Sequence, residues 1–417
     1  MFSIVMVISG LLFIDVFFIL SGMSIDFDWD GVLVGYGEIA IKSHRVRRRF
    51  VRKLAINIIK GLRELNVKCK IHHKWSRLLI KTNDIPSTIK LLKKIFGVVF
   101  SAPYKFVRLN ELDDFFEKYS QLLIGDANSF AIRVKRSGTH PFTSKDLERH
   151  LGAIVKNKTG VKVCLDNPEK TVYVEVRGDE CYIYNEKHIG PSGLPLGVSG
   201  KVVCLISGGI DSPVAAWLMM RRGCSIIPLY AKLTGSLEDL DFKRFIEITK
   251  ILRGWHIGVS MPIYVYDHEY NLKIFSVYAS NYTCILCKRM MYRVANELAK
   301  KVNANAIVTG ESLAQVASQT LYNLRVIDQV SELPVLRPLI GFNKDESINL
   351  AKMIGTYEIS CMNLPDKWLR VRGCWARPSK PVTRAKLEKV LELESKINIE
   401  ELFRRSIESL RELEDDY

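Results

Sequence analysis

A short apolar run near the middle of the chain ends abruptly in a glycine-rich turn. Residues 202–206 are all apolar and lead into Ser207-Gly208-Gly209-Ile210-Asp211-Ser212. Gly208 and Gly209 lack a Cβ, so their amides can approach an anion closely and can adopt positive φ. Asp211 and Ser212 are helix-capping types, and unpaired amides at a helix N-terminus attract anions. The pattern therefore predicts a buried strand, a phosphate-binding loop and a helix.

This loop lacks the lysine of the GxxxxGK[ST] phosphate loop, so a different nucleotide chemistry is indicated. Its Ser-Gly-Gly-x-Asp-Ser string resembles the PP-loop of ATP pyrophosphatases. That resemblance implies cleavage of ATP between the α and β phosphates and adenylation of a substrate. An ordinary tight turn is the alternative, and the complete strand, loop and helix pattern favours the nucleotide site.

Two later blocks carry side chains suited to a nucleotide. Lys288 lies on a helix expected at 284–302, and Gly310 and Gln319 follow the apolar run 306–308. Lys288 would reach a phosphate, Gly310 would let the nucleotide lie against backbone, and Gln319 offers an amide. A capped helix N-terminus without a ligand is the alternative.

The composition describes a folded protein with a strongly basic charge. The 417 residues are 47% hydrophobic and carry a formal net charge of +16, so two or three domains are expected. The charge favours a polyanionic partner such as nucleic acid. Nine scattered cysteines, an odd number, favour a reducing compartment over a disulfide framework, and we expect a cytoplasmic protein.

The first residues are unusually apolar. Residues 2–20 are long enough to span a bilayer, but Asp15 interrupts them at a cost of about 2.5–3.5 kcal/mol. No basic segment precedes the run, as it would in a signal peptide, and Met23 follows it directly. We expect residues 1–22 to be an over-extended start rather than a membrane segment. A signal anchor is the alternative.

Basic residues gather at two places in the N-terminal half. A helix expected after Ser43 begins with several Lys and Arg residues and no acid, which opposes the helix dipole unless phosphates are bound. A second group surrounds the turn before a helix expected at 144–157. A solvated face is the alternative for both. The residues predicted to contact RNA are Arg45, Arg48, Arg49, Arg52, Lys135, Arg136 and Lys145.

Strand and helix patterns alternate after residue 200, which predicts a doubly wound parallel sheet with ligands at the carboxyl ends of its strands. The N-terminal half reads as smaller α+β units. Its layout, with Gly37-Glu38-Ile39-Ala40-Ile41-Lys42, resembles the ferredoxin-like and THUMP domains of tRNA-modifying enzymes. The predicted fold class is α/β, and the predicted domains are ferredoxin-like 23–82, THUMP 83–188, linker 189–199, PP-loop 200–382 and C-terminal helices 383–417.

Together the motifs resemble the ThiI family of tRNA 4-thiouridine synthetases, in its short archaeal-like form. The resemblance implies ATP and Mg²⁺ as cofactors, tRNA as partner, a homodimer and no membrane. The implied reaction adenylates uracil O4 at position 8 of tRNA and replaces it with sulfur. Asp211 would serve adenylation, and the implied ATP pocket is lined by Leu205, Ile206, Ser207, Gly208, Gly209, Ser212, Tyr230, Ala231, Lys288, Gly310 and Gln319.

The resemblance offers more than one source of sulfur. Cys374 aligns with the family's PP-loop-domain cysteine, whose bacterial partner lies in a rhodanese domain that this chain lacks. The bacterial persulfide relay and a role in thiamine synthesis are therefore in doubt. Cys284 and Cys287 offer a replacement. With Cys374, or Cys361, as third thiolate they would hold an iron–sulfur cluster; a disulfide or persulfide pair is equally open, supplied by sulfide or a persulfide carrier.

Two other classes of protein compete with this interpretation. A PP-loop ligase would adenylate a small molecule without RNA, and a related enzyme would thiolate tRNA elsewhere. A non-enzymatic RNA-binding module is the third class. The intact loop from Ser207 to Ser212 argues against that last class, and the basic helix after Ser43 argues against the ligase.

Overall fold

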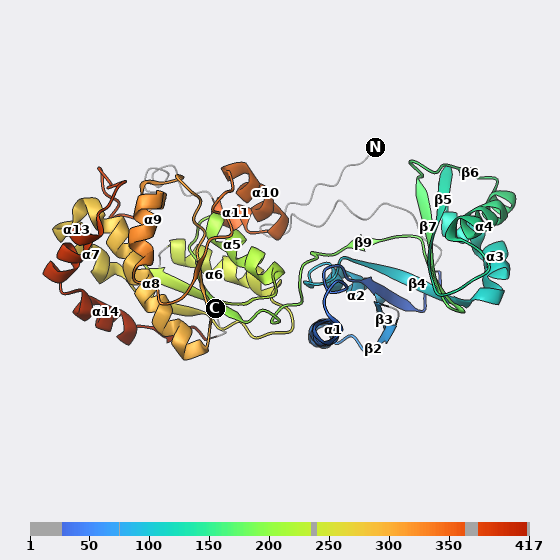
Figure 1. Ribbon diagram of the computed structural model, residues 1–417, viewed down its shortest axis with the longest axis horizontal. Coiled ribbons are helices and arrows are strands. Elements are labelled where there is room, and N and C mark those ends of the chain that lie inside the picture. The colour runs from blue at the N-terminus through green and yellow to red at the C-terminus, as the bar shows by residue number, and fades with distance from the viewer. Residues whose placement is uncertain (1–26, 75, 235–239, 363–373, 415–417) are drawn as a thin grey trace, which may run out of the picture. The chain divides into compact units, whose positions relative to one another are not determined.

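The computed structural model describes residues 27–74, 76–234, 240–362 and 374–414 (Figure 1). The chain divides into two compact units, because Pro103–Glu186 and the described residues up to Asp30 cluster apart from Gly31–Ala102 and Lys187–Tyr417. The apolar segment expected at 1–22 lies outside the described residues. None of the described helices is long and apolar enough to cross a membrane.

The second unit begins with a small α+β fold around an antiparallel β2–β3–β1 arrangement. Leu54 and Ile58 of the first helix pack in one core with Ile89 and Leu92 of the second, so both helices belong to this fold. The boundary between this fold and the other unit, which contains Pro103–Glu186 and is inserted into it, therefore lies after Ala102. This is later than the predicted position after residue 82. Its elements are β1 (Gly31–Gly35), α1 (His44–Glu64), β2 (Cys69–Lys74), β3 (Arg77–Thr82) and α2 (Ile85–Leu92).

The inserted unit is entered through β4 (Phe100–Arg108) and left before β9 (His188–Ile189), which pairs with the start of β4. Its strand order is β4-β8-β7-β5-β6, with β5 and β7 parallel. Phe27 and Trp29 pack on its aromatic core beside Phe115 and Tyr119. Its other elements are η1 (Leu109–Glu111), α3 (Leu112–Ile124), β5 (Ser129–Ser137), α4 (Ser144–Thr159), β6 (Lys162–Val163), β7 (Lys170–Arg177) and β8 (Glu180–Tyr184).

A six-stranded sheet forms the centre of the C-terminal part, in the order β14-β13-β10-β11-β12-β15. The five strands from β14 to β12 are parallel, which confirms the predicted doubly wound sheet. The strands are β10 (Lys201–Leu205), β11 (Ser225–Lys232), β12 (Tyr264–Asp267), β13 (Ile307–Val308), β14 (Val335–Leu336) and the antiparallel β15 (Arg411–Glu412).

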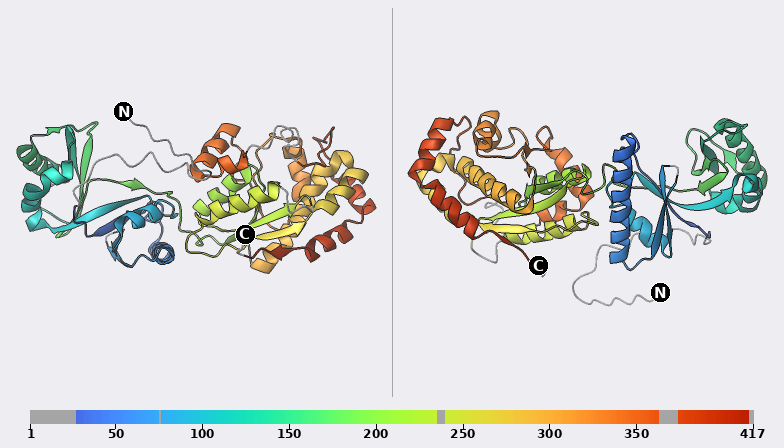
Figure 2. Two further views of the ribbon diagram at one scale, coloured as in Figure 1. Left: turned by 180° about the vertical axis from the view of Figure 1, so that it is seen from behind. Right: turned by 60° about the horizontal axis from the view of Figure 1, so that its bottom comes forward.

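Helices cover both faces of this sheet (Figure 2). Successive side chains of β10 alternate between the two cores: Val203 packs in the core beneath α8, and Val202 and Cys204 pack in the core beneath α5 and α6. The helices are α5 (Asp211–Arg221), α6 (Leu240–Arg253), α7 (Glu269–Tyr278), η2 (Ser280–Tyr282), α8 (Thr283–Val302), η3 (Ala317–Gln319), α9 (Leu321–Asp328), α10 (Lys344–Ile354), α11 (Tyr357–Ser360), α13 (Leu387–Lys396) and α14 (Ile399–Glu408).

The C-terminal helices are built into this sheet domain rather than appended to it. Glu394 of α13 is almost fully buried and forms two-pronged ion pairs with Arg289 and Arg293 of α8. Leu393 and Leu402 lie in the same core as α8. The division predicted at residue 382 is therefore not a structural boundary.

Candidate nucleotide and sulfur site

The glycine-rich loop lies at the carboxyl end of β10, between β13 and β11. This is the point where the strand order reverses, and open α/β sheets bind ligands there. The N–H of Ser207 donates to Ser212 Oγ at 2.9 Å and the N–H of Gly209 donates to Ser207 Oγ at 3.3 Å, which folds the loop back on the helix. Among the described residues, the amides of Gly208 and Ile210 have no partner, so they are available to an anion.

The glycines of the loop are better explained by neighbouring atoms that lie close to them than by an unusual backbone conformation. Neither Gly208 nor Gly209 adopts positive φ, so that expectation was wrong. A Cβ on Gly208 would lie 3.1 Å from the Cβ of Arg244. Gly310, after β13, lies against the loop helix, and a Cβ there would be 2.5 Å from the backbone N of Ser212. A side chain at position 310 would therefore clash with the backbone, so this position requires glycine.

Asp211 is held by two side chains that the sequence reasoning missed. Lys344 Nζ lies 3.0 and 2.8 Å from its two carboxylate oxygens, and Gln315 Nε2 donates to Oδ2 at 3.2 Å. Lys344 is the first residue of α10, whose N-cap Asn343 is fixed by a capping box with Glu346. A carboxylate and an ammonium thus stand side by side at the phosphate loop. The carboxylate is a ligand type that Mg²⁺ prefers, and the ammonium suits a phosphate.

Lys288 is anchored by a buried acid network. Its Nζ lies 2.6 Å from Oε1 of Glu311, which is 5% exposed, and Arg337 Nε lies 2.6 Å from Oε2 of the same carboxylate. Burial alone would raise the pKa of Glu311, but Lys288 and Arg337 beside it bring that pKa below its usual value. Lys288 is therefore fixed at the start of α8, next to the loop after β13.

The remaining residues predicted for ATP lie at strand ends on this edge. Leu205 is the last residue of β10 and Ile206 follows it, and Tyr230 and Ala231 are buried near the end of β11. The ring of Tyr230 stacks on Phe245 with centroids 4.6 Å apart, so this tyrosine belongs to the core that supports the site. Gln319 Oε1 is buried without a hydrogen-bond partner in the described parts of the chain. An orphaned acceptor of this kind suits an amino group of a nucleobase.

Three cysteines lie together beside the nucleotide edge. Burial raises the pKa of the Cys287 thiol, the nearby Cys374 and Cys284 raise that pKa further, and Lys288 opposes them. Cys361 is instead a neighbour of Tyr357 on α11, whose pKa it raises. The structure thus groups Cys374, rather than Cys361, with the CxxC pair. No three His, Cys, Asp or Glu side chains in the described ranges are placed to hold a metal ion.

A buried histidine adjoins this group. His268 follows β12 and is fully buried, with Nε2 3.2 Å from the Sγ of Cys287. Burial lowers the pKa of His268 to about 3, so the imidazole is neutral near pH 7. The sequence reasoning missed this residue because it lies 19 positions before Cys287 and outside any motif.

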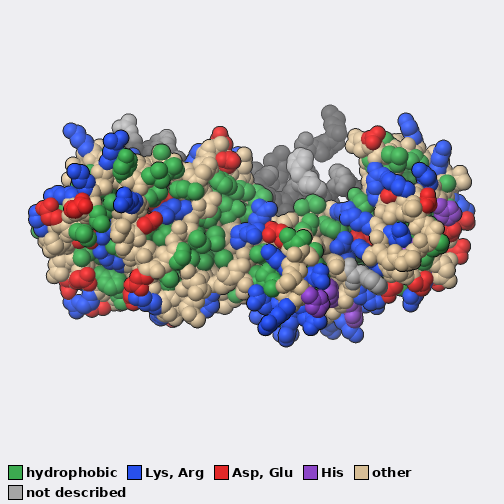
Figure 3. Space-filling view, in the orientation of Figure 1, with side chains coloured by type: hydrophobic (Ala, Val, Ile, Leu, Met, Phe, Trp, Pro, Cys, Tyr) green, Lys and Arg blue, Asp and Glu red, His purple; other side chains and the backbone are tan. Residues whose placement is uncertain are grey.

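The predicted RNA contacts fall on both units. Arg45, Arg48, Arg49 and Arg52 are exposed on α1, where many Lys and Arg side chains gather (Figure 3), and within the described ranges no carboxylate forms an ion pair with them. Some of them line a hollow of about 420 Å³ with Tyr36 and His73.

On the inserted unit, Lys135 is exposed and the charge of Lys145 is partly balanced by Glu148 at 3.0 Å. Arg136 NH1 lies 3.1 Å from Nδ1 of His140. Of the two predicted RNA surfaces, α1 is therefore the one that presents a row of charges without described carboxylate partners.

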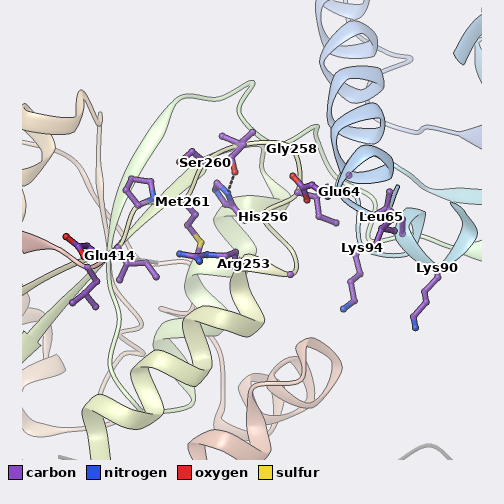
Figure 4. Close-up of a pocket in the computed structure, with 18 of the residues that line it drawn as sticks. Glu64, Leu65, Lys90, Lys94, Arg253, His256, Gly258, Ser260, Met261 and Glu414 are labelled. Atoms are coloured by element: carbon purple, nitrogen blue, oxygen red, sulfur yellow. Dashed lines mark hydrogen bonds between the residues drawn. The ribbon is translucent and has the colours of Figure 1, made fainter. Parts of the chain in front are cut away.

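A second hollow, of about 950 Å³, opens at the other edge of the parallel sheet (Figure 4). It is lined by the connection from α6 to β12 and by ends of α1 and α2. At its wall, His256 Nε2 accepts from the N–H of Ile226, and Nδ1–H donates to the carbonyl of Val259. Its charges are mixed, because Lys90 and Lys94 face it together with Glu64 and Glu414. It lies away from the phosphate loop and does not resemble a polyanion site.

The sheet, its loop at the switch point and the Asp211–Lys344 pair define a PP-loop ATP pyrophosphatase domain, here joined to two small α+β domains. Three family models match in order: the ThiI ferredoxin-like domain over residues 31–101, the THUMP domain over 109–186, and the Thiamine biosynthesis protein (ThiI) over 197–399. The chain belongs to the ThiI family of tRNA sulfurtransferases.

Relatives and solved structures agree with this assignment. The chain is 39% identical over 394 residues to a "Probable tRNA sulfurtransferase" of Methanobrevibacter smithii, covering 92% of this chain and 100% of that protein. It is 40% identical over 383 residues to the protein of the same name in Methanocaldococcus jannaschii, covering 88% and 97%.

Among solved structures, a 4-thiouridine synthetase–RNA complex with bound ATP matches with a TM-score of 0.81 and 28% identity, covering 93% of this chain and 100% of that one. A protein of Pyrococcus horikoshii shares the fold, with a TM-score of 0.62 and 21% identity, over 78% and 99% of the two chains.

Proposed function

We propose that this protein is an ATP-dependent tRNA sulfurtransferase that converts uridine at position 8 of tRNA to 4-thiouridine. One observation carries the proposal: the Ser207–Ser212 loop, with free amides and the Asp211–Lys344 pair, lies at the switch point of the parallel sheet. The similarity to a synthetase whose crystal structure holds RNA and ATP supports the same reaction.

The first step is adenylation. The uracil O4 attacks the α-phosphorus of ATP, the bond to the β-phosphate breaks, and pyrophosphate leaves onto the loop. The amides of Gly208 and Ile210 and the ammonium of Lys344 stabilise the charge that develops on the leaving group. Asp211 and the pyrophosphate oxygens would hold Mg²⁺, which neutralises phosphate charge when bound.

In the second step a sulfur nucleophile attacks C4 and AMP leaves with the former O4. We assign the delivery of this sulfur to the group of Cys284, Cys287 and Cys374, which are near enough to affect each other's pKa. Sulfide would attack C4 directly, whereas the outer sulfur of a cysteine persulfide would attack C4 and a second cysteine would then cleave the S–S bond, which leaves a disulfide. Two forms of this step are proposed: sulfide or persulfide chemistry at these thiols, and an iron–sulfur cluster that the three thiolates would hold. Iron content decides between the two.

Recognition of tRNA would rest on phosphates and shape. The exposed arginines of α1 supply unbalanced positive charge, and the THUMP domain supplies a second surface. A homodimer in the cytoplasm is part of the same proposal.

The test is an anaerobic assay of the full chain with unmodified tRNA, ATP, Mg²⁺ and sulfide, in which 4-thiouridine is measured by its near-UV absorbance. Asp211→Ala should abolish pyrophosphate release and product, whereas Cys287→Ala should abolish product alone. Iron is quantified in the same preparation. Pyrophosphate release without sulfur in the tRNA would overturn the assignment of the substrate and leave only the ATP site.

A further inference from the structure

The indole of Trp375 is fixed within a short turn. Trp375 Nε1–H donates to the carbonyl of Leu233 at 2.9 Å, and the N–H of Arg377 donates to the carbonyl of Cys374 at 3.1 Å. Ala376, the next residue, is 7% exposed and anchors the turn in the protein. The indole therefore loses little conformational freedom when a ligand packs on it.

This turn lies at the carboxyl edge of the parallel sheet, beside the phosphate loop. Leu233, which accepts the hydrogen bond of the indole, directly follows β11. The carbonyl oxygen of Asp241 lies 3.2 Å from the position that a Cβ on Gly208 would occupy. Burial raises the pKa of Cys374 and the charge of Asp241 adds to this, so Cys374 is a neighbour of the same residue. Trp375 thus adjoins both the phosphate loop and the cysteine group.

The ring of Trp375 is accessible at this edge. Trp375 is 45% exposed, whereas tryptophan side chains are mostly buried. Tyr270 has a similar exposure of 44%, but Arg405 lies over its ring, 4.0 Å from the centroid. Within the described ranges, neither a cation nor another aromatic ring is placed over Trp375. A planar ligand can therefore reach this ring.

The proposed reaction needs a surface of this kind. The target uracil must leave the base stack of the tRNA for its O4 to reach the ATP phosphorus and its C4 to reach the sulfur. An extruded base loses its stacking neighbours, and aromatic side chains replace them in proteins that bind unpaired nucleotides. Because the sulfur is delivered from the group that contains Cys374, the uracil must come to the turn in which Trp375 follows Cys374.

We propose that Trp375 positions the extruded uracil of the tRNA by stacking its indole on the base. The inference rests on the proposed function and adds the residue that receives the substrate base. Because every base has a π-face, Trp375 orients the uracil without selecting it.

The test compares three variants of the full chain in steady-state assays of 4-thiouridine formation. Trp375→Ala removes the ring, and Trp375→Phe keeps a ring but removes the hydrogen bond to Leu233. Tyr270→Ala is the matched control, because it removes a ring of similar exposure that packs against Arg405 of α14. The KM values for tRNA and for ATP are measured separately.

Trp375→Ala should lower kcat/KM for tRNA about tenfold or more, as expected for loss of one base–aromatic stack, while the KM for ATP changes less than about twofold. Trp375→Phe should stay within about threefold of the wild type and Tyr270→Ala within about twofold. If the Phe variant lost as much as the Ala variant, the hydrogen bond rather than the ring would matter, and the inference would be overturned. A rise in the KM for ATP instead of tRNA would assign the ring to adenine and overturn it as well.

A crosslinking readout separates this inference from the proposed function. A tRNA carrying 5-iodouridine at position 8 is bound to the wild type and irradiated, and the crosslinked residue is mapped by mass spectrometry. Since 5-iodouracil couples to an aromatic ring stacked on it, the crosslink should map to Trp375, and no sulfur transfer is needed. A crosslink elsewhere, or none, would overturn the inference. A crosslink at Trp375 in a wild type that makes no 4-thiouridine would overturn the proposed function alone.

Discussion

Lys344 and Asp211 are joined by two short contacts, 2.8 and 3.0 Å, although 133 positions separate them in the chain. The pair places a cation at the phosphate loop, which has no lysine of its own. Lys344 is 44% exposed at its side chain, so it can turn from the carboxylate to a phosphate without breaking the core. In the GxxxxGK[ST] loop, the lysine belongs to the loop itself. Here the positive charge comes from Lys344 on α10, which is far from the loop in the sequence.

Replacing Lys344 by Ala should lower kcat/KM for 4-thiouridine formation by about 100-fold, because a donor to the leaving pyrophosphate is lost. Steady-state rates measured against ATP check this. Lys352→Ala is the control, because Lys352 lies on the same helix and its described side-chain contact is with the ring of Tyr357. If the Lys344→Ala variant kept more than half of the wild-type rate, Lys344 would have no role at the site.

Replacing Gly310 by Ala should weaken ATP binding about tenfold or more, because the new Cβ would press on the backbone of Ser212. Calorimetric titration with ATP measures this. Gly341→Ala is the control, since nothing lies within 4 Å of a Cβ there and its φ is not positive. Equal ATP affinity in both variants would contradict the close approach.

Replacing Glu394 by Ala should destabilise the sheet domain by about 3 kcal/mol or more, because Arg289, 1% exposed, loses its only described carboxylate partner. Denaturant unfolding followed by intrinsic fluorescence gives the change. Glu392→Ala, on the same helix but exposed and paired with Lys389 and Lys396, should leave the midpoint unchanged. Matching midpoints for the two variants would show that the buried pair contributes no stability.

Lowering the pH should reduce the free energy of unfolding, because His256 is buried in its neutral form. Burial lowers its pKa to about 4, whereas an unfolded histidine titrates near about 6.5. Between these values the unfolded state binds the extra proton, so stability rises with pH in that window and is lost as pH falls. From pH 7 to pH 5 the wild type should lose about 2 kcal/mol more than His256→Leu. Denaturant unfolding at the two pH values measures the difference, and parallel losses would contradict it.

Replacing Arg48 by Ala should reduce the slope of log affinity against log salt by about 1 if this residue contacts an RNA phosphate. Filter binding of tRNA at several salt concentrations gives the slope. Arg404→Ala is the control, because Arg404 is exposed but paired with Glu401 and Glu408. The same slope for both variants would place the RNA contact elsewhere.

Local patterns in the sequence were enough to predict the nucleotide edge. The run before Ser207, the glycines and the capping residues act over a few positions, and the structure has β10, the loop and α5 where they were expected. Lys344, Gln315 and His268 could not be found in this way, because each meets its partner only after the sheet has formed.

The division after residue 82 was misplaced for a related reason. The amphipathic pattern of α2 shows that one face is buried but does not identify the core that covers it, and this core is shared with α1. The two-residue strand β15 was missed because so short a segment has no period to detect.

The antiparallel pairing of β15 with β12 bears on how the protein is made. Val265 and Tyr264 pair with Arg411 and Glu412, and α13 and α14 complete the core beneath α8. During synthesis the phosphate loop leaves the ribosome about 200 residues before the strand that closes its sheet. The ATP-binding domain therefore cannot finish folding before residue 412 has been synthesised, whereas the THUMP domain, whose described strands all precede residue 187, can fold earlier on the nascent chain.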